Sequence, residues 1–243
     1  MEGTTSAQRS LVTGANRGLG LELCRQLLAR GGRVVAACRH PGKATALNTL
    51  AGEYPGRLHV TPLDVTEPKS HAALARELPL LTDGEPLDLL INNAGVLRGG
   101  ERYGSVQAAD LETSFRTHAL GPFLLVQTLS PQLADGAHVA NISSEIGSIG
   151  LREASLHQEF RTPSYAIGKA AQNMATSLLA QALAPRSIVV VALHPGWVRT
   201  DMGTDRAVLS PQESAHGLLR VLGGLTARDS GTFLDWQGKT LPW

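Results

Sequence analysis

Several features are scarce in this sequence of 243 residues, and each scarcity argues against a class of protein. Only two cysteines occur, Cys24 in a predicted helix and Cys38 at a predicted strand end, which argues against a disulfide framework and for a reducing compartment. No apolar run approaches the roughly 18 residues of a membrane span, and residues 1–9 lack the apolar region of a signal peptide. We therefore expect a soluble, cytoplasmic protein with both cysteines inert in its core.

An excess of charge of either sign is also lacking. The formal net charge is +1, and charged residues make up 18% of the chain. This balance gives no reason to expect nucleic acid or an anionic membrane as a partner. A small-molecule ligand is favoured instead, and no metal site is predicted.

Short apolar segments alternate with helical stretches along the whole chain. Strands separated by helices pair in parallel through right-handed crossovers, so this order predicts an α/β fold with a doubly wound open sheet. We expect one domain over residues 1–243, because α/β folds reach this size as single units and no repeat or linker interrupts the chain. The six predicted strands and a seventh at the sheet edge are Leu11–Val12, Val34–Ala37, Leu58–Val60, Leu87–Ile91, His138–Ile142, Ile188–Leu193 and Thr232–Leu234.

A glycine-rich turn, residues 13–20, follows the first predicted strand and leads into a helix with apolar periodicity. Glycines let the backbone approach phosphates, and a helix N-terminus offers amide donors and the positive end of the helix dipole. Three glycines alone also suit a tight turn, but strand, turn and helix occur here in the order that a pyrophosphate site needs. The predicted cofactor contacts in this glycine loop are Gly14, Asn16, Arg17, Gly18, Leu19 and Gly20.

The residues after the second strand indicate the type of nicotinamide cofactor. Enzymes that use NAD place an acidic residue there, on the ribose diol. This chain has Cys38-Arg39-His40 instead, and Arg39 can pair with a 2′-phosphate through forked hydrogen bonds. Arg17 adds a second cation, so NADPH is predicted, although either arginine alone is also explained by ordinary solvation. Further predicted cofactor contacts after the third and fourth strands are Asp64, Val65, Asn93, Ala94 and Gly95.

Candidate catalytic side chains follow the fifth strand and lie on a later helix. The strand ends in Ser143-Ser144, and a helix predicted to start at Thr162-Pro163 carries Tyr165 and Lys169. A spacing of four residues puts Tyr165 and Lys169 on one helix face, where their polar tips can converge. A Tyr-Lys pair alone is a weak signal, because it also fits a surface lysine beside a half-buried tyrosine. Its combination with the glycine loop makes it a strong one.

These side chains suit carbonyl reduction, which needs a hydride from the nicotinamide and a proton for the developing alkoxide. Tyr165 is the predicted general acid, and Ser144 is the predicted donor that polarises the carbonyl. Lys169 supplies positive charge that favours the phenolate, and it binds the ribose hydroxyls. The irregular stretches 147–161 and 196–210 follow predicted strands and are expected to form the substrate entrance.

Together these motifs resemble those of the short-chain dehydrogenase/reductase family over essentially the whole chain. The resemblance implies a Rossmann fold, and it favours Ser144 over Ser143 because the family places the catalytic serine second in the pair. Residues 194–202, H-P-G-W-V-R-T-D-M, are similar to the family segment whose backbone meets the nicotinamide carboxamide. Residues 194–202, 209–214 and 233–239 also resemble the C-factor/sniffer-like branch, linked to carbonyl reduction and, in some members, to signalling. The cofactor contacts implied here are Pro195, Gly196, Val198 and Thr200.

One position departs from the family pattern. The family usually has an asparagine three residues before a glycine on the fourth major helix, where it holds a water that relays protons toward the lysine. His118, before Gly121, takes that place here. A neutral imidazole both donates and accepts, so His118 either preserves the relay in altered form or simply packs, and both interpretations stay open.

Three functions are compatible with these residues. The first is NADPH-dependent reduction of a ketone, aldehyde or quinone, with Trp197 and Met202 indicating an apolar substrate. The second is a nucleotide-binding signalling protein of the C-factor type with little or no turnover, for which His118 leaves room. The third, NAD-linked alcohol oxidation, is opposed by Arg39. Small residues on the Tyr165 helix are compatible with close packing in a homodimer: Ala166, Ala170 and Ala171.

Overall fold

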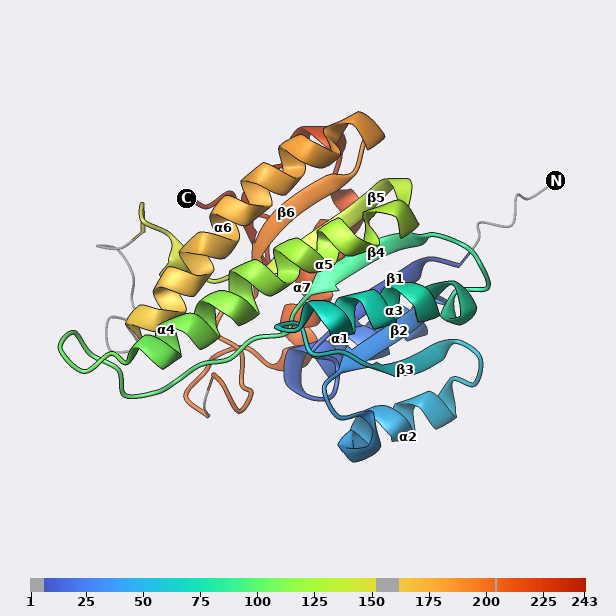
Figure 1. Ribbon diagram of the computed structural model, residues 1–243, viewed down its shortest axis with the longest axis horizontal. Helices are drawn as coiled ribbons and strands as arrows, with labels where there is room; N and C mark the ends of the chain where they lie inside the picture. The colour runs from blue at the N-terminus through green and yellow to red at the C-terminus, as the bar shows by residue number, and fades with distance from the viewer. Residues whose placement is uncertain (1–6, 152–161, 204) are drawn as a thin grey trace.

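A parallel sheet lies at the centre of the computed structural model, which describes residues 7–151, 162–203 and 205–243 (Figure 1). Within these residues seven strands pair in the order β3-β2-β1-β4-β5-β6-β7. The order reverses at β1, which pairs with both β2 and β4, so a binding crevice is expected beyond the carboxyl ends of β1 and β4. The strands are β1 (Arg9–Thr13), β2 (Arg33–Cys38), β3 (Leu58–Pro62), β4 (Leu87–Asn92), β5 (Leu133–Ile142), β6 (Val189–His194) and β7 (Phe233–Asp235).

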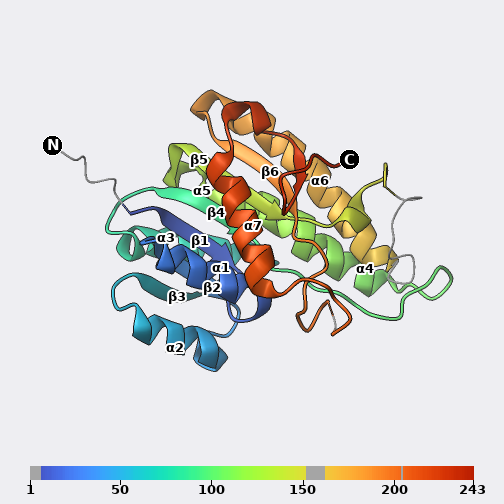
Figure 2. The same ribbon diagram turned by 180° about the vertical axis from the view of Figure 1, so that it is seen from behind.

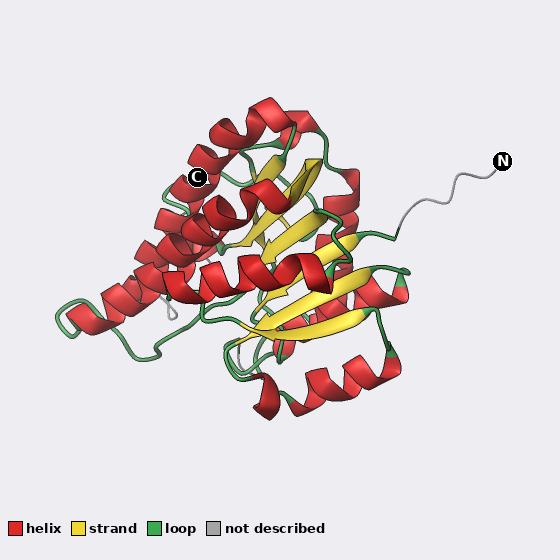
Figure 3. Ribbon diagram, turned by 45° about the vertical axis from the view of Figure 1, so that its right-hand side comes forward, coloured by secondary structure: helices red, strands yellow, loops and turns green. Residues whose placement is uncertain are grey.

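Helices cover both faces of the sheet, because strands of a parallel sheet are apolar on both sides. The cluster around Leu23 and Leu218 lies under one set of helices, and the cluster around Leu78 and Leu125 lies under the other. Figures 1 and 2 show the two helical layers, and Figure 3 shows the sheet between them. One layer contains α1 (Gly18–Ala29), α2 (Thr45–Glu53) and α7 (Pro211–Gly224); the other contains α3 (Pro68–Leu81), α5 (Gly121–Leu129) and α6 (Pro163–Leu183). The predicted doubly wound α/β fold is confirmed.

A distorted helix runs beside α6. It consists of α4 (Ala108–Phe115), a π-helical turn η2 (Arg116–Leu120) and α5. π-Turns inside α-helices occur frequently at functional sites. His118 lies in this turn, and its imidazole faces Tyr165 and Gly168 of α6.

The strand predictions were correct in number and order but differed at the ends. β5 begins at Leu133, five residues before the predicted start at His138. Asp135 and Gly136 are turn-forming residues, so the pattern places the start after them. The structure instead accommodates them through a register shift in the pairing of β4 with β5, between Leu87 and Leu89.

The start of α6 is confirmed at Pro163, but its predicted cap is wrong in detail. Thr162 takes the extended N-cap conformation, yet its side chain makes no capping hydrogen bond. The carboxylate of Glu101 accepts the Ser164 backbone N–H at 3.0 Å instead. A carboxylate at this place also complements the helix dipole.

Candidate active site

A cleft of about 540 Å³ lies beyond the carboxyl ends of the strands. It extends from the glycine loop, past the ends of β2 and β3, to the start of α6. Every site residue predicted from the sequence lines it: Gly14, Asn16, Arg17, Gly18, Leu19, Gly20, Arg39, Asp64, Val65, Asn93, Ala94, Gly95, His118, Ser144, Tyr165, Lys169, Pro195, Gly196, Val198 and Thr200.

The glycine loop is shaped by contacts that exclude side chains. Gly14 has a φ of +65°, and a Cβ there would lie 2.8 Å from the Cα of Ala94. The amide of Asn93 donates to the carbonyl oxygen of Thr13 at 2.9 Å, and the Thr13 hydroxyl accepts the backbone N–H of Asn93 at 3.0 Å. Asn93 therefore does more than line the cleft, because it fastens the segment after β4 to the glycine loop.

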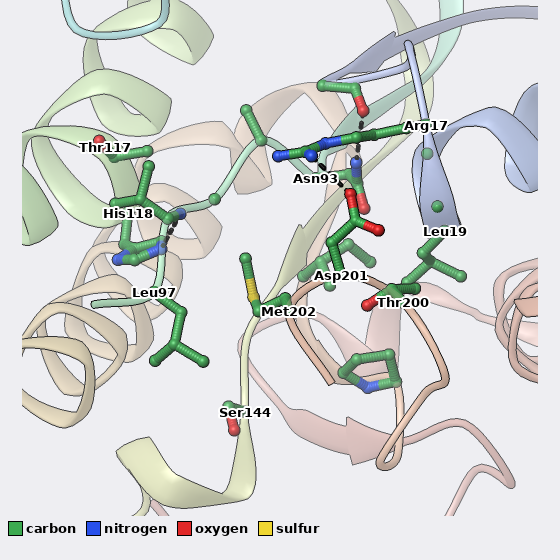
Figure 4. A pocket seen from close by; sticks show the side chains of 18 of the residues that line it. Arg17, Leu19, Asn93, Leu97, Thr117, His118, Ser144, Thr200, Asp201 and Met202 are labelled. Carbon is green, nitrogen blue, oxygen red and sulfur yellow. Dashed lines mark hydrogen bonds and ion pairs between the residues drawn. The ribbon is translucent and has the colours of Figure 1, made fainter. Parts of the chain in front are cut away.

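Cationic side chains gather at one end of the cleft. Arg17 forms an ion pair with Asp201 at 2.5 Å, and both side chains are more than two-thirds exposed (Figure 4). Arg39 lies close enough to Asp64 to affect its ionisation. Burial opposes ionisation of Asp64, but hydrogen bonds from Thr66 and the charge of Arg39 outweigh it and lower the pKa. This end of the cleft suits an anionic group.

The other end brings Ser144, Tyr165 and Lys169 together. The Ser143 hydroxyl donates to Asn173 Oδ1 at 2.6 Å, whereas the Ser144 side chain forms a hydrogen bond with Tyr165. Lys169 Nζ lies 5.6 Å from the centre of the Tyr165 ring. The Tyr165 side chain thus meets the serine, and the Lys169 ammonium lies beside the Tyr165 ring.

The environment shifts the pKa of both helix residues. Burial raises the pKa of Tyr165 to about 12, with the Ser144 hydrogen bond opposing it. Burial also lowers the pKa of Lys169 to about 7. The protein alone therefore keeps the phenol protonated, and the lysine titrates close to neutral pH.

His118 is fully buried and held by protein groups. Its Nε2 accepts the Val96 backbone N–H at 3.1 Å, so Nδ1 carries the ring proton and faces the Ser114 hydroxyl at 3.1 Å. Ser114 Oγ in turn donates to the Ser164 carbonyl oxygen at 2.7 Å. Burial, and then the charge of Lys169, hold the pKa of His118 well below its usual range. The imidazole is neutral at pH 7; its part in a proton relay stays a prediction.

The segment after β6 closes one side of the cleft. Val198 pairs with Leu209 in an isolated parallel bridge, and the Trp197 indole donates to the Gly203 carbonyl oxygen at 2.6 Å. Met202 is partly exposed in the cleft, and its terminal methyl group lies against Gly95 (Figure 4). Part of the other predicted substrate wall, residues 152–161, lies outside the described residues.

The sequence matches the short chain dehydrogenase family over residues 8–208. The chain belongs to this family. C-signal of Myxococcus xanthus is 41% identical over 160 residues, covering 65% of this chain and 93% of that protein. An NADPH-bound carbonyl reductase from chicken fatty liver has a TM-score of 0.92 at 38% identity, with 98% of this chain and 99% of that chain covered. Carbonyl reductase Sniffer of D. melanogaster has a TM-score of 0.90 at 29% identity, with 98% and 100% covered. The resemblance inferred from the motifs is confirmed.

Some residues that shape this site are not among those predicted from the sequence. Lys43 lines the cationic end of the cleft from the turn η1 (Pro41–Lys43), and its position four residues after Arg39 was an available signal. Glu101 and Ser114 carried no such signal, because each acts through a contact with Ser164, which is 63 residues from Glu101 and 50 from Ser114. Cys38, expected to be inert in the core, is buried but also lines the cleft.

Proposed function

We propose that this chain is an NADPH-dependent carbonyl reductase with Tyr165 as its general acid. The observation that carries the proposal is one cleft that is lined by Ser144, Tyr165 and Lys169 and also by three cationic side chains, Arg17 of the glycine loop and Arg39 and Lys43 after β2. NADPH needs both parts of the cleft, because its 2′-phosphate is on the adenosine ribose, at the opposite end of the molecule from its nicotinamide.

The residues present suit the phosphorylated cofactor. The glycine loop and the N-terminus of α1 offer backbone donors for the pyrophosphate. Arg39 and Lys43 offer cationic donors for the 2′-phosphate, while the residues after β2 include no carboxylate. Bound NADPH supplies the hydride for the reduction. The NADPH-bound carbonyl reductase described above supports this choice through its similarity along the whole chain.

The chain's own side chains hold and deliver the proton. Ser144 donates a hydrogen bond to the substrate carbonyl oxygen, and Tyr165 Oη gives its proton to that oxygen as negative charge develops there. Lys169 binds ribose hydroxyls and stabilises the phenolate that remains. His118, in the place of the family asparagine, packs edge-on against the Tyr165 ring, and Val96 and Ser114 engage its two ring nitrogens.

The substrate is a ketone, aldehyde or quinone with an apolar body. Leu97, Ile146 and Met202 line the cleft and support this proposal, and the backbone N–H of Ile146 donates to Ser144 Oγ. Small-molecule sites usually combine an apolar lining with a few polar groups that orient the ligand, here Ser144, Tyr165 and Lys169.

We also propose a domain organisation, a location and an oligomeric state. Residues 1–243 act as one NADP-binding domain, and the two free, buried cysteines support a cytoplasmic location. None of the helices in the described part of the chain has the length and apolarity that a membrane crossing requires. A homodimer through α6 is supported by the exposed apolar side chains of Ile167, Met174 and Leu178. Of the three small residues that the sequence suggested for this contact, Ala166 is buried within the chain, whereas Ala170 and Ala171 are partly exposed.

A signalling role with little or no turnover is the second candidate, and similarity to C-signal favours it. The intact catalytic group favours the reductase. The test is to mix purified protein and NADPH with a panel of quinones, diketones and aldehydes and to follow the absorbance of the reduced cofactor. We expect oxidation of NADPH with at least one aromatic or aliphatic carbonyl. Tight NADPH binding with no oxidation across the panel would favour the signalling role over the reductase.

A further inference from the structure

The ammonium of Lys169 is held from behind by two oxygen atoms. Nζ donates to the Ile142 carbonyl oxygen at 2.5 Å and to Gln172 Oε1 at 2.9 Å. Lys169 is only 3% exposed, so these acceptors replace most of the water that an ammonium would otherwise bind. An ammonium has three N–H groups, and two acceptors leave one for the cleft that Lys169 lines.

Gln172 lies one turn beyond Lys169 on α6 and is almost fully buried. Its amide orientation is fixed, because an ammonium only donates and Oε1 must therefore face it. Among the described residues, Gln172 Nε2 then has no hydrogen-bond partner, although it is buried. An unpaired buried amide destabilises the folded protein, and an apolar side chain of the same length would avoid that cost. The contact with Lys169 explains why glutamine occurs here.

We propose that Gln172 is a positioning residue for the reductase, which holds the buried ammonium of Lys169 in place and in its charged form. The inference rests on the proposed function of Lys169. Gln172 itself does not line the cleft, so it acts through the lysine and touches neither substrate nor cofactor.

The charge of Lys169 is sensitive to such a contact. Burial lowers its pKa to about 7, so the ammonium and the neutral amine are close in free energy at neutral pH. Tyr165 on the same helix and His118 on η2 stay uncharged at neutral pH. Two further titratable side chains line the cleft, Glu145 on η4 (Glu145–Gly147) and His194 at the end of β6, and they lie 3.8 Å apart. The Gln172 oxygen is the side-chain acceptor that bonds the ammonium directly.

Two substitutions at Gln172 distinguish the role of its hydrogen-bond acceptor from the role of its side-chain packing. Gln172→Met keeps the length of the side chain and removes the acceptor, whereas Gln172→Glu keeps an acceptor and adds negative charge. Gln181→Met, on the exposed side of the same helix, is the matched control. Lysine labelled with ¹³C at Cε reports the titration of Lys169 by NMR, with the Lys169→Arg variant identifying its signal.

We expect the Lys169 midpoint to fall in Gln172→Met, to rise in Gln172→Glu and to stay unchanged in Gln181→Met. This measurement needs no turnover, so it decides the role of Gln172 even if no carbonyl is reduced. If the glutamate variant does not fold, the methionine variant decides alone. Equal Lys169 midpoints in wild type and Gln172→Met would overturn the proposal.

Turnover gives the second reading. The pH at which kcat declines on the alkaline side should move in the same direction as the Lys169 midpoint. If the midpoint falls by about one pH unit, the fraction of charged Lys169 at pH values above the midpoint falls about tenfold. A role in packing alone would lower the melting temperature of Gln172→Met without moving the pH at which kcat declines. That result would also overturn the proposal.

Discussion

The imidazole of His118 meets the ring of Tyr165 edge-on, with ring centroids 5.1 Å apart and planes at 84°. This contact requires a close approach between η2 and α6, and Gly168 provides it. A Cβ at Gly168 would lie 2.5 Å from Ser114 Oγ and 3.0 Å from His118 Nδ1. The absence of a side chain at one helix position therefore makes room for the histidine that packs on the proposed general acid.

The first prediction concerns Gly168→Ala. Helix propensity alone would make this change stabilising by about 1 kcal/mol, because glycine is unfavourable inside helices. We expect instead a loss of about 1–3 kcal/mol in the free energy of unfolding, since the new methyl group overlaps Ser114 and His118. Urea unfolding of the single variants and of Gly168→Ala/His118→Ala forms a double-mutant cycle. The loss should shrink in the His118→Ala background; a stabilised single variant would contradict the packing account.

The second prediction concerns cofactor choice. Arg39→Asp removes a cation from the 2′-phosphate end and adds a carboxylate, so NADPH should bind at least tenfold more weakly while NADH binding is kept or improved. Fluorescence titration of both cofactors measures the ratio. Arg76→Asp, on the exposed side of α3, is the control and should leave the ratio unchanged. Equal losses for the two cofactors in Arg39→Asp would refute the phosphate assignment.

The third prediction concerns Glu101, whose carboxylate accepts the Ser164 hydroxyl at 2.7 Å and caps α6. Glu101→Ala leaves the start of the catalytic helix without its cap and should cost about 1–2 kcal/mol of stability. Thermal unfolding measures the loss, with the exposed Glu112→Ala on α4 as control. Because Tyr165 follows Ser164 directly, kcat should fall as well. A melting temperature equal to that of the control variant would show that the cap is unimportant.

The fourth prediction follows from the pKa of Lys169, which burial lowers from 10.5 to about 7. Between these values the unfolded chain binds more protons than the folded protein, so this residue makes stability rise with pH from about 7 to 10.5. Below pH 7 its cost to stability is fully present. Lys169→Met should therefore raise the free energy of unfolding at pH 6, and the gain should shrink by pH 9. Urea unfolding at both values tests the sign; a gain that grows with pH would contradict it.

Cleft residues that lie within a few neighbouring positions of the chain could be predicted from the sequence. The glycine loop, Arg39, and Tyr165 with Lys169 are local patterns, and the parallel sheet brings their segments to one edge. Contacts between distant segments left no such pattern. Glu101 capping α6, Ser114 between His118 and Ser164, and the effect of Gly168 all depend on how η2 and the loop after β4 pack against α6.

His118 shows the same limit for a single residue. Its departure from the family pattern was visible in the sequence, and relay and packing remained equally open. The structure adds its partners: Val96 N–H and the Ser114 hydroxyl face the two ring nitrogens. These partners depend on backbone geometry that the sequence alone does not specify.

The proposed reaction is reduction of a carbonyl by NADPH, with the proton supplied by Tyr165. The most direct measurement compares wild type with Tyr165→Phe in NADPH oxidation driven by the best carbonyl of the panel, with Tyr103→Phe, a fully exposed tyrosine, as control. We predict that Tyr165→Phe lowers kcat by about a hundredfold or more while NADPH still binds, and that Tyr103→Phe is unchanged. Turnover by Tyr165→Phe at the wild-type rate would contradict the mechanism.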